Sequence, residues 1–414
     1  MSKNKILVSL LIAAGLVSPM AHATNGYFAH GYGVKSQSMG GVGVALPQDS
    51  LAAATNPAGM VMVGDRIDFG LEWFKPTRGA DIAGNGAGLN GTYSGNNTSN
   101  FLIPDFGYNK MMNPDMSLGV SVYGNGGMNT DYASSPFAAF GGTSPAGVNL
   151  EQLFIAPTWA MKLNPGNSIG ASLNLAYQSF EAKGLQPFAG SSSDSTKLTN
   201  NGKDTSTGYG LRVGWTGQVS PMVTLGATYQ TKTKMSKFSK YAGLFAEQGG
   251  FDIPASYGLG IAVNAAPETT VAFDIQGIQY GDVKSIANSN AAGGALGANN
   301  GAGFGWQNMT VYKLGVSHAY SPTLTLRAGL STNNQPIPSS QTFFNVLAPG
   351  VVQNHLTLGG TWTLESKSEL SLGYMHAFKN TVNGAGSISA AQGSGNANLN
   401  MYQDSLSVAY SWKL

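Results

Sequence analysis

The sequence predicts an all-β fold, a 14-stranded antiparallel transmembrane β-barrel with an N-terminal plug of short helices. Three observations lead to this prediction. The chain begins with the pattern of a secretory signal peptide. The remainder alternates apolar and polar residues in runs long enough to cross a bilayer as strands. Charged residues make up only 10% of the chain, whereas about 25% is ordinary in soluble proteins.

The first segment, residues 1–23, has the order of a signal peptide. Lys3 and Lys5 give it a basic start, residues 6–17 are almost wholly apolar, and small residues lead to a cleavage position that we expect after Ala23. The apolar run is about 12 residues long, whereas a membrane-spanning helix needs about 20. The segment therefore predicts export rather than anchoring.

Charge and cysteine content exclude several classes of function. The whole chain has a formal net charge of +2, and cleavage removes two lysines, so the mature chain is formally neutral. We therefore expect no nucleic-acid partner. The chain contains no cysteine, which excludes disulfide scaffolds, thiolate metal sites and cysteine nucleophiles. We predict neither a metal nor a cofactor.

Period-two alternation identifies the strands. In the last ten residues every even position from Leu406 to Leu414 is apolar, and the odd positions are small or polar. Such a pattern gives a strand one apolar face. The runs are about 9 to 13 residues long, which is the length that a tilted strand needs to cross a bilayer. We predict fourteen strands, at residues 66–75, 101–110, 117–125, 151–163, 168–182, 207–218, 223–235, 255–264, 269–281, 307–319, 323–334, 354–365, 368–380 and 401–414.

The connections between these strands alternate strictly in length. Six short, turn-like connections are separated by seven long ones that are rich in Gly, Asn, Ser and Ala. Outer-membrane barrels have short periplasmic turns and long outer loops. The alternation therefore predicts a cell outer-membrane barrel, at residues 66–414.

Residues 24–65 precede the first strand and show no long alternation. We expect short helical turns at Val34–Met39 and at Ser50–Ala54, followed by a tight turn at Asn56–Gly59. The residues are small and mildly apolar, which suits the interior of a barrel. We call this predicted plug the hatch.

Two segments of the hatch, Gly33–Leu46 and Asp49–Gly59, resemble the N-terminal hatch of the FadL/TodX family. The resemblance extends over fourteen strands and over Lys234–Phe251, in the loop where family members carry an apolar helical lid. One departure is the C-terminal Leu414, where family members end in Phe. The family consists of outer-membrane channels for long-chain fatty acids and aromatic hydrocarbons.

The resemblance implies passive uptake of hydrophobic compounds. An outer apolar groove would capture the solute, a pocket near the hatch would receive it, and an opening in the barrel wall would release it sideways into the membrane. The implied substrate-binding residues include two sets. The groove set is Met235, Phe238, Tyr241, Leu244 and Phe245, of which 238, 241 and 245 fall on one helical face. The pocket set is Tyr27 and Phe28, at the mature N-terminus.

The resemblance also implies a gate. Gly124, Gly126 and Gly127 follow the third predicted strand, and glycines inside a strand favour a bulge or kink. The family places its lateral gap at a kinked third strand. Asn56, Pro57 and Ala58 would then hold the hatch against the wall near that gap.

Four charged residues fall on the inner phase of their strands. They are Arg327, Lys313, Arg212 and Asp105. A lone charge in a low-dielectric interior is costly. The cations could therefore pair with Asp105 or with a hatch acid such as Asp49, or Arg327 and Lys313 could bind a fatty-acid carboxylate. Both readings stay open at this point.

Two other functions agree less well with the sequence. A general aqueous porin would share the barrel and loops, but it needs no long segment before the first strand. A barrel enzyme needs a nucleophile beside a base, and no such motif stands out in the sequence. We therefore expect a channel and no enzyme, acting as a monomer. Its partners would be hydrophobic ligands, outer-membrane lipid and lipopolysaccharide, and the barrel-assembly machinery during biogenesis.

Overall fold

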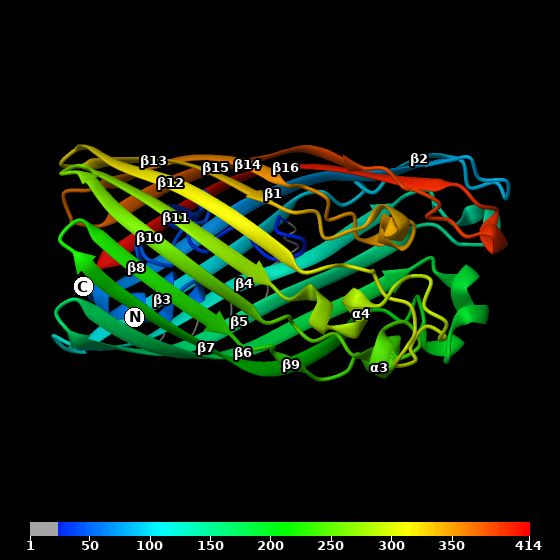
Figure 1. The fold of residues 1–414 in the computed structure, drawn as a ribbon, viewed down its shortest axis with the longest axis horizontal. Helices are drawn as coiled ribbons and strands as arrows, with labels where there is room; N and C mark the ends of the chain where they lie inside the picture. The colour runs from blue at the N-terminus through cyan, green and yellow to red at the C-terminus, as the bar shows by residue number, and fades with distance from the viewer. Residues whose placement is uncertain (1–23) are drawn as a thin grey trace, which may run out of the picture.

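Fourteen long strands form one closed antiparallel barrel in the computed structural model, which describes residues 24–414 (Figure 1). The predicted signal peptide, residues 1–23, lies outside the described residues. The barrel strands are β1 (Arg66–Ala83), β3 (Phe101–Asn113), β4 (Met116–Tyr132), β5 (Ala146–Asn164), β6 (Asn167–Lys183), β7 (Asp204–Ser220), β8 (Val223–Gln230), β10 (Ser256–Ala266), β11 (Thr269–Ile278), β12 (Met309–Ser321), β13 (Leu324–Asn333), β14 (Asn354–Thr363), β15 (Glu369–Val382) and β16 (Asn396–Lys413).

Closure comes from pairing between the first and last strands. β1 pairs with β16 along its whole length, from Arg66 opposite Lys413 to Ala83 opposite Asn396. Lipid offers no partner to backbone amides, so a spanning sheet must close on itself. Two short strands lie outside the wall, β2 (Gly91–Ser94) and β9 (Lys234–Met235). The predicted strand 223–235 is therefore wrong at its end, because β8 stops at Gln230 and β9 pairs with β7 instead.

Several wall strands run further toward the loops than their alternation predicts. The first strand was expected at 66–75 and continues to Ala83, and the last was expected from 401 and begins at Asn396. Alternation fades beyond the bilayer because an outward side chain there no longer needs to be apolar. Backbone pairing does not depend on that pattern, so the strands continue.

The two faces of the wall differ as the alternation predicts. On β16, Leu406 and Val408 are exposed on the outer face, whereas Ser405 and Ser407 are buried inside. The short turns gather at one end of the barrel, together with the C-terminus, and the long loops gather at the other end (Figure 1). Within residues 24–414, no helix is long and apolar enough to cross a membrane.

The long loops carry only short helical segments. They are η3 (Ala138–Phe140), η4 (Gln186–Ser191), η5 (Ser195–Lys197), η6 (Ser239–Tyr241), α3 (Ala246–Gly249), η7 (Tyr280–Asp282), α4 (Lys284–Ala287), η8 (Ser339–Gln341), η9 (Phe344–Leu347) and η10 (Ala390–Gln392). They bring side chains that are distant in sequence together at the mouth of the barrel.

The hatch contains three short helical segments, α2 (Val34–Gln37), η1 (Ala52–Ala54) and η2 (Pro57–Met62). The first two fall within the expected turns. The expected tight turn at Asn56–Gly59 is instead the start of η2. Asn56 caps this helix, because its side-chain oxygen accepts a hydrogen bond from the Ala58 amide at 3.1 Å.

Candidate functional site

Close backbone contact seats the hatch in the barrel. A Cβ atom added at Gly226 would lie 2.3 Å from the Val44 carbonyl oxygen, and one at Gly214 would lie 1.8 Å from the Asn56 side chain. These wall positions admit glycine because a larger residue would collide with the hatch. The wall glycines that meet the hatch in this way include Gly107, Gly119, Gly170, Gly214, Gly226, Gly315, Gly329 and Gly359.

The Asn56-Pro57-Ala58 triplet contacts the wall at β6 and β7. The Asn56 amide donates to the Trp215 carbonyl at 2.9 Å. The Ser168 hydroxyl donates to the Ala58 carbonyl at 3.0 Å, and Pro57 lies against Gly170. The triplet thus touches the wall two to three strands away from β4, which is the third strand of the barrel. The family resemblance had led us to expect this contact beside β4.

Buried ion pairs fasten the other side of the hatch. The Lys35 ammonium lies 2.5 Å from the Glu369 carboxylate, which also accepts from Arg66 at 3.3 Å. Burial lowers the pKa of Lys35, and nearby Arg66 lowers it further, while Asp49 and Glu369 oppose the shift. Burial and the neighbouring Asp68 raise the pKa of Asp49. These charges are therefore part of the hatch anchorage.

The inward cations also contact the hatch, mostly through uncharged partners. Arg327 donates to the Gln48 side chain at 2.9 Å and to the Thr361 hydroxyl at 2.7 Å. Lys313 donates to the carbonyls of His30 and Gly41 at 3.1 and 3.3 Å. The expected pairing of these cations with Asp105 or Asp49 is absent from the ion pairs among residues 24–414. They donate instead to uncharged oxygens of the hatch and, for Arg327, of the wall residue Thr361.

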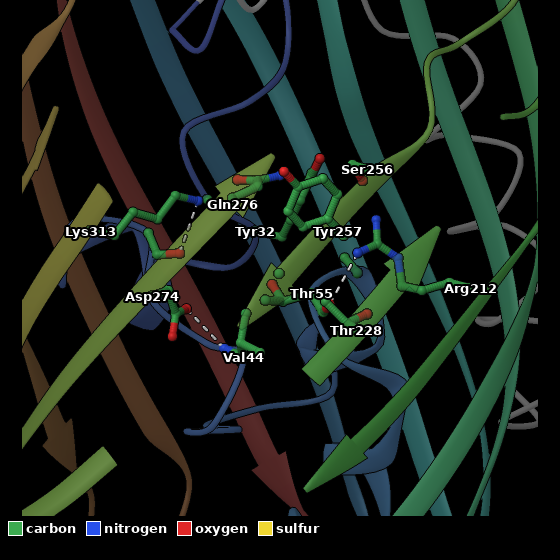
Figure 2. Close-up of a pocket in the computed structure, with 14 residues that line it drawn as sticks. Tyr32, Val44, Thr55, Arg212, Thr228, Ser256, Tyr257, Asp274, Gln276 and Lys313 are labelled. Atoms are coloured by element: carbon green, nitrogen blue, oxygen red, sulfur yellow. Dashed lines mark hydrogen bonds between the residues drawn. The ribbon is translucent and has the colours of Figure 1, made fainter. Parts of the chain in front are cut away.

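A narrow cavity lies between the hatch and strands β7 to β12 (Figure 2). Arg212, Asp274 and Lys313 line it from the wall. The Asp274 carboxylate accepts from the Gly43 and Val44 amides at 2.7 and 3.0 Å. The Arg212 guanidinium donates to the Thr55 carbonyl at 3.0 Å. Each of these charges thus holds the hatch backbone across the cavity.

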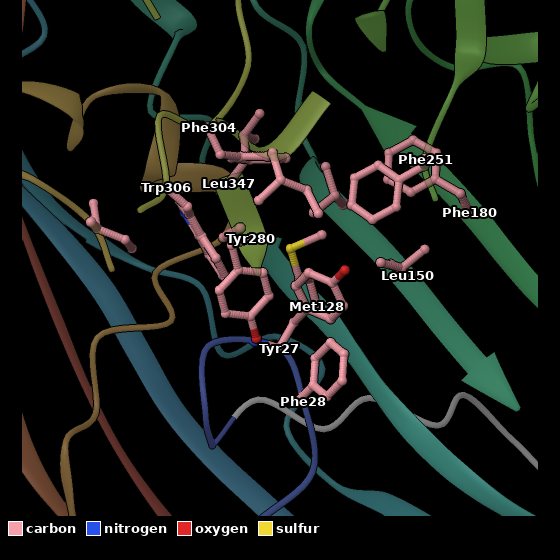
Figure 3. Close-up of a cluster of buried hydrophobic side chains, with 14 of the residues drawn as sticks. Tyr27, Phe28, Met128, Leu150, Phe180, Phe251, Tyr280, Phe304, Trp306 and Leu347 are labelled. Atoms are coloured by element: carbon pink, nitrogen blue, oxygen red, sulfur yellow. The ribbon is translucent and has the colours of Figure 1, made fainter. Parts of the chain in front are cut away.

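On the loop side of the hatch, aromatic and aliphatic side chains fill the lumen (Figure 3). They come from the hatch, from β4 to β6, and from three separate loops. Tyr27 lies at the centre, with ring centroids 5.2 Å from Tyr280, 5.9 Å from Trp306 and 6.1 Å from Phe251. We call this the aromatic cluster, and it comprises Tyr27, Phe28, Met128, Leu150, Phe180, Phe251, Tyr280, Phe304, Trp306 and Leu347.

The residues expected to line an outer groove pack against the upper part of this cluster. Phe238, Tyr241 and Phe245 surround the ring of Phe180, at centroid distances of 5.7, 4.8 and 4.6 Å. Leu244 is buried with them, and Met235 is partly buried. The expected helical lid is instead two short pieces, η6 and α3, joined by a bend. We call residues 234–251 the lid segment. Its aromatic side chains Phe238, Tyr241 and Phe245 are thus buried against the cluster.

On its loop side, β4 is only partly paired with β3. Its pairing with β3 ends at Phe106 opposite Val122, although β3 continues beside β1 up to Phe101. Its pairing with β5 shifts register between Gly124 and Gly126. Asn125 is therefore a bulge residue, as the glycines in this stretch predict. The loop-side part of β4 thus has an edge that β3 does not cover.

The N-terminus of the hatch covers that edge. The Ala29 amide donates to the Asn125 carbonyl, and the Gly127 amide donates to the Tyr27 carbonyl, both at 2.9 Å. Phe28 and Gly126 form an isolated antiparallel bridge. Residues 27–29 thus act as a short added strand, and the same residues form the floor of the aromatic cluster.

Sequence reasoning missed the loop residues of the aromatic cluster. Tyr280 and Trp306 come from the loop between β11 and β12, and Leu347 comes from the loop between β13 and β14. Periodicity carries no signal for where a loop folds. It also missed the amides Gln152 and Gln178, which lie buried on β5 and β6. Their inward phase was visible in the alternation, since a buried amide at an inner position has to find a partner.

Solved structures of similar fold include two toluene transporters and a FadL homologue. The P. putida toluene transporter TodX has 21% identity and a TM-score of 0.68, and the match covers 93% of this chain and 99% of TodX. A P. aeruginosa FadL homologue has 14% identity and a TM-score of 0.71, with 94% and 99% covered. The Ralstonia pickettii toluene transporter TbuX has 18% identity and a TM-score of 0.64, with 92% and 98% covered.

Among curated proteins, none matches the sequence. The family comparison is decisive, because its match spans nearly the whole chain and includes both the hatch and the barrel. The profile of the outer membrane protein transport protein family (OMPP1/FadL/TodX) matches residues 20–411. The chain therefore belongs to this family of outer-membrane transport channels, which are not enzymes.

Proposed function

We propose that this channel takes up hydrophobic compounds, either aromatic hydrocarbons or long-chain fatty acids, passively across the outer membrane. The solute enters past the lid segment and occupies the aromatic cluster. It then leaves sideways, through the wall between β3 and β4, into the lipid. The solved relatives TodX and TbuX are toluene transporters by name, which supports the first of the two substrate classes.

One observation carries this proposal: residues 27–29 belong both to the aromatic cluster and to the wall. Tyr27 and Phe28 contact the rings above them, while their backbone pairs with the free edge of β4. A solute that displaces these rings also pulls the backbone away from β4. Binding and opening are thereby linked in one short segment.

The chemistry of the cluster favours an apolar solute. Two of its three polar side-chain groups are already bonded, the Tyr280 hydroxyl to the Asn25 carbonyl and the Trp306 indole to the Asn345 side chain, each at 2.5 Å. The third, the Tyr27 hydroxyl, is buried without a partner among residues 24–414. A polar solute would gain only the Tyr27 hydroxyl as a partner there and would lose the rest of its hydration. Hydrocarbon, in contrast, gains from every apolar surface that it covers. The apolar body of the solute is therefore the part recognised.

An aqueous porin agrees less well with this interior. The hatch contacts the wall through glycines, hydrogen bonds and ion pairs on several sides, and aromatic rings occupy the lumen above it. We expect single-channel recordings in planar bilayers to show small or no steady ion current. A large, steady conductance would favour the porin instead.

Uptake by a strain that lacks the protein tests the function directly. We expect uptake of toluene, a medium-chain alkane or oleate to fall when the chain is deleted and to return when it is restored. If none of these solutes depended on the protein, the proposed function would be wrong. Glucose serves as the polar control, which should not depend on the chain.

Gly126→Ala tests the gate. The added Cβ would lie 1.8 Å from the Tyr27 carbonyl oxygen, so residues 27–29 can no longer pair with β4. We expect toluene affinity to fall about tenfold, because the floor of the cluster is lost. Gly190→Ala is the matched control, because a Cβ there meets nothing within 4 Å. Unchanged affinity in Gly126→Ala would contradict the assigned role of residues 27–29.

A further inference from the structure

Three buried amide side chains form a row across neighbouring strands, at the side of the aromatic cluster that faces the hatch. They are Asn125 on β4, Gln152 on β5 and Gln178 on β6, and each is 0% exposed. Gln152 lies directly opposite Gln178 in the β5–β6 register, and the bulge at Asn125 faces Gln152 across β4 and β5. We call these three residues the amide row.

The row is one continuous hydrogen-bond chain. The Asn125 Nδ2 donates to Gln152 Oε1 at 3.0 Å, and the Gln152 Nε2 donates to Gln178 Oε1 at 3.1 Å. At one end the Gln178 Nε2 donates to the main-chain carbonyl of Phe251 at 2.8 Å. At the other end the Tyr32 hydroxyl donates to Asn125 Oδ1 at 3.2 Å. The row thus joins the lid segment to the hatch.

The end at Phe251 fixes the orientation of every amide. A main-chain carbonyl can only accept, so Gln178 must turn its NH2 group toward it and its oxygen toward Gln152. Gln152 must then face Asn125 with its oxygen, which leaves the Asn125 oxygen for Tyr32. The direction set at the lid therefore reaches the hatch through three side chains.

Both ends of the row lie at moving parts of the proposed transport path. The Phe251 ring packs 4.8 Å from Phe245 in the lid segment and 6.1 Å from Tyr27 in the hatch. The Asn125 main-chain oxygen accepts the amide of Ala29, which is one of the bonds that cover the free edge of β4. The row therefore connects the position of Phe251 to the hydrogen bond between Asn125 and Ala29 at the gate.

We propose that the amide row couples the lid segment to the gate, so that a solute displacing Phe251 also loosens residues 27–29 from β4. This inference rests on the proposed function, because it assigns the regulation of the same path. Asn125, Gln152 and Gln178 are positioning residues, and they need not touch the solute.

The physical basis is the cost of an unpaired buried amide. When Phe251 moves, the Gln178 NH2 group loses its acceptor in an apolar setting, and the amide turns to find another. That rotation presents the wrong atom to Gln152, and the mismatch passes on to Asn125. A chain of buried hydrogen bonds responds as a unit because each bond polarises the next. The Asn125 bulge then releases Tyr32 and the hatch end.

A cysteine reporter tests the coupling. Because the chain contains no native cysteine, the introduced thiol is the only one that can be labelled. Ala29→Cys places a thiol at a buried position of the gate. In lipid nanodiscs, we expect toluene to raise the labelling rate of this thiol by a water-soluble maleimide about tenfold, which is the shift that one buried hydrogen bond carries. In Gln152→Leu, on the same reporter, we expect the toluene response to fall below about twofold.

Two further variants guard against a folding defect. Gln178→Leu breaks the row at its next member and should give the same loss. Asn174→Leu is the matched control: it removes another 0%-exposed amide of β6, one that bonds to Gln230 at 3.1 Å and lies outside the row. It should keep the full response. Folding of each variant is checked by its heat-modifiable migration on gels.

The outcomes separate the coupling from the function. If Gln152→Leu and Gln178→Leu keep the tenfold response, the coupling is overturned, while toluene binding and uptake, measured separately, still stand. If the Asn174→Leu control loses the response equally, the row has no special role and the proposal is also overturned. If the reporter protein neither binds nor takes up toluene, an alkane or oleate, the proposed function fails and the coupling fails with it.

Discussion

The two halves of the lumen are filled in opposite ways. In the half beside the short turns, the hatch lies against wall glycines and is held by buried ion pairs and hydrogen bonds. In the half beside the loops, aromatic rings from distant segments interleave with few polar contacts. Polar contacts fix one geometry, whereas apolar packing accepts substitutes of similar volume. The first half therefore determines position, and the second half receives a solute.

Among changes to the hatch half of the lumen, Glu369→Ala should have the largest effect on conductance. The change leaves Lys35 and Arg66 buried without their shared carboxylate, which costs about 3–5 kcal/mol for a broken buried pair. We expect the hatch to leave its seat and planar-bilayer conductance to rise. Glu365→Ala, in the neighbouring turn and exposed, is the control. Low conductance in Glu369→Ala would show that the ion pairs do not hold the hatch.

A smaller effect should come from Gly226→Val. The branched side chain collides with the Val44 carbonyl, which lies 2.3 Å from the position of a Cβ. Overpacking of this kind costs about 1–3 kcal/mol, so we expect partial unseating of the hatch and intermediate conductance. Gly190→Val meets open space and should behave as the parent. Equal conductance for the two variants would show that close contact at Gly226 does not hold the hatch in place.

Acidification should loosen the hatch through His30. Burial lowers the pKa of His30 well below its usual 6.5, and His355 and Lys313 beside it lower it further. The docked state thus binds fewer protons than the undocked state at pH values below 6.5. Docking therefore weakens as the pH falls through 6.5, by at most about 1.4 kcal/mol per pH unit.

The measurement is bilayer conductance between pH 7.5 and 5. We expect the conductance of the parent to rise on acidification and that of His30→Gln to change less. The His30 carbonyl that accepts from Lys313 belongs to the main chain, so the variant keeps this contact. A pH response in His30→Gln as large as that of the parent would assign the effect to another group.

The smallest effect should come from Lys284→Ala in the loop half. Its ammonium lies 2.8 Å from the Glu247 carboxylate, with both side chains about half exposed. Exposed pairs contribute less than about 1 kcal/mol and are screened by salt. We expect toluene uptake within about twofold of the parent. A tenfold loss would mean that lid closure depends on surface charge rather than on apolar packing.

The sequence predicted the barrel better than its contents. Alternation located fourteen strands because lipid on one side and a lumen on the other impose a period of two. It placed the start of β1 at residue 66, where the structure has Arg66. It failed at the end of β8, because the apolar positions near Met235 serve the lid segment and not the wall.

The site was predicted in part. The cluster residues Tyr27 and Phe28 came from the family resemblance, and the bulge near Gly124 came from the glycines of that stretch. The partners of Arg327 could not be read from the sequence, since Gln48 lies 279 positions away and no local pattern joins them. Ring contacts between loops, such as Phe304 with Phe344, likewise depend on tertiary folding alone.

Photolabelling with a diazirine-bearing arene tests the central claim most directly, because it marks the path that a solute takes. The protein is irradiated in lipid nanodiscs with the arene bound, and adducts are mapped by mass spectrometry. We expect adducts on the aromatic cluster and on both borders of the wall opening, residues 101–105 of β3 and 123–128 of β4. Adducts confined to the cluster and to the lower hatch, residues 34–62, would contradict lateral release and indicate passage through the barrel axis.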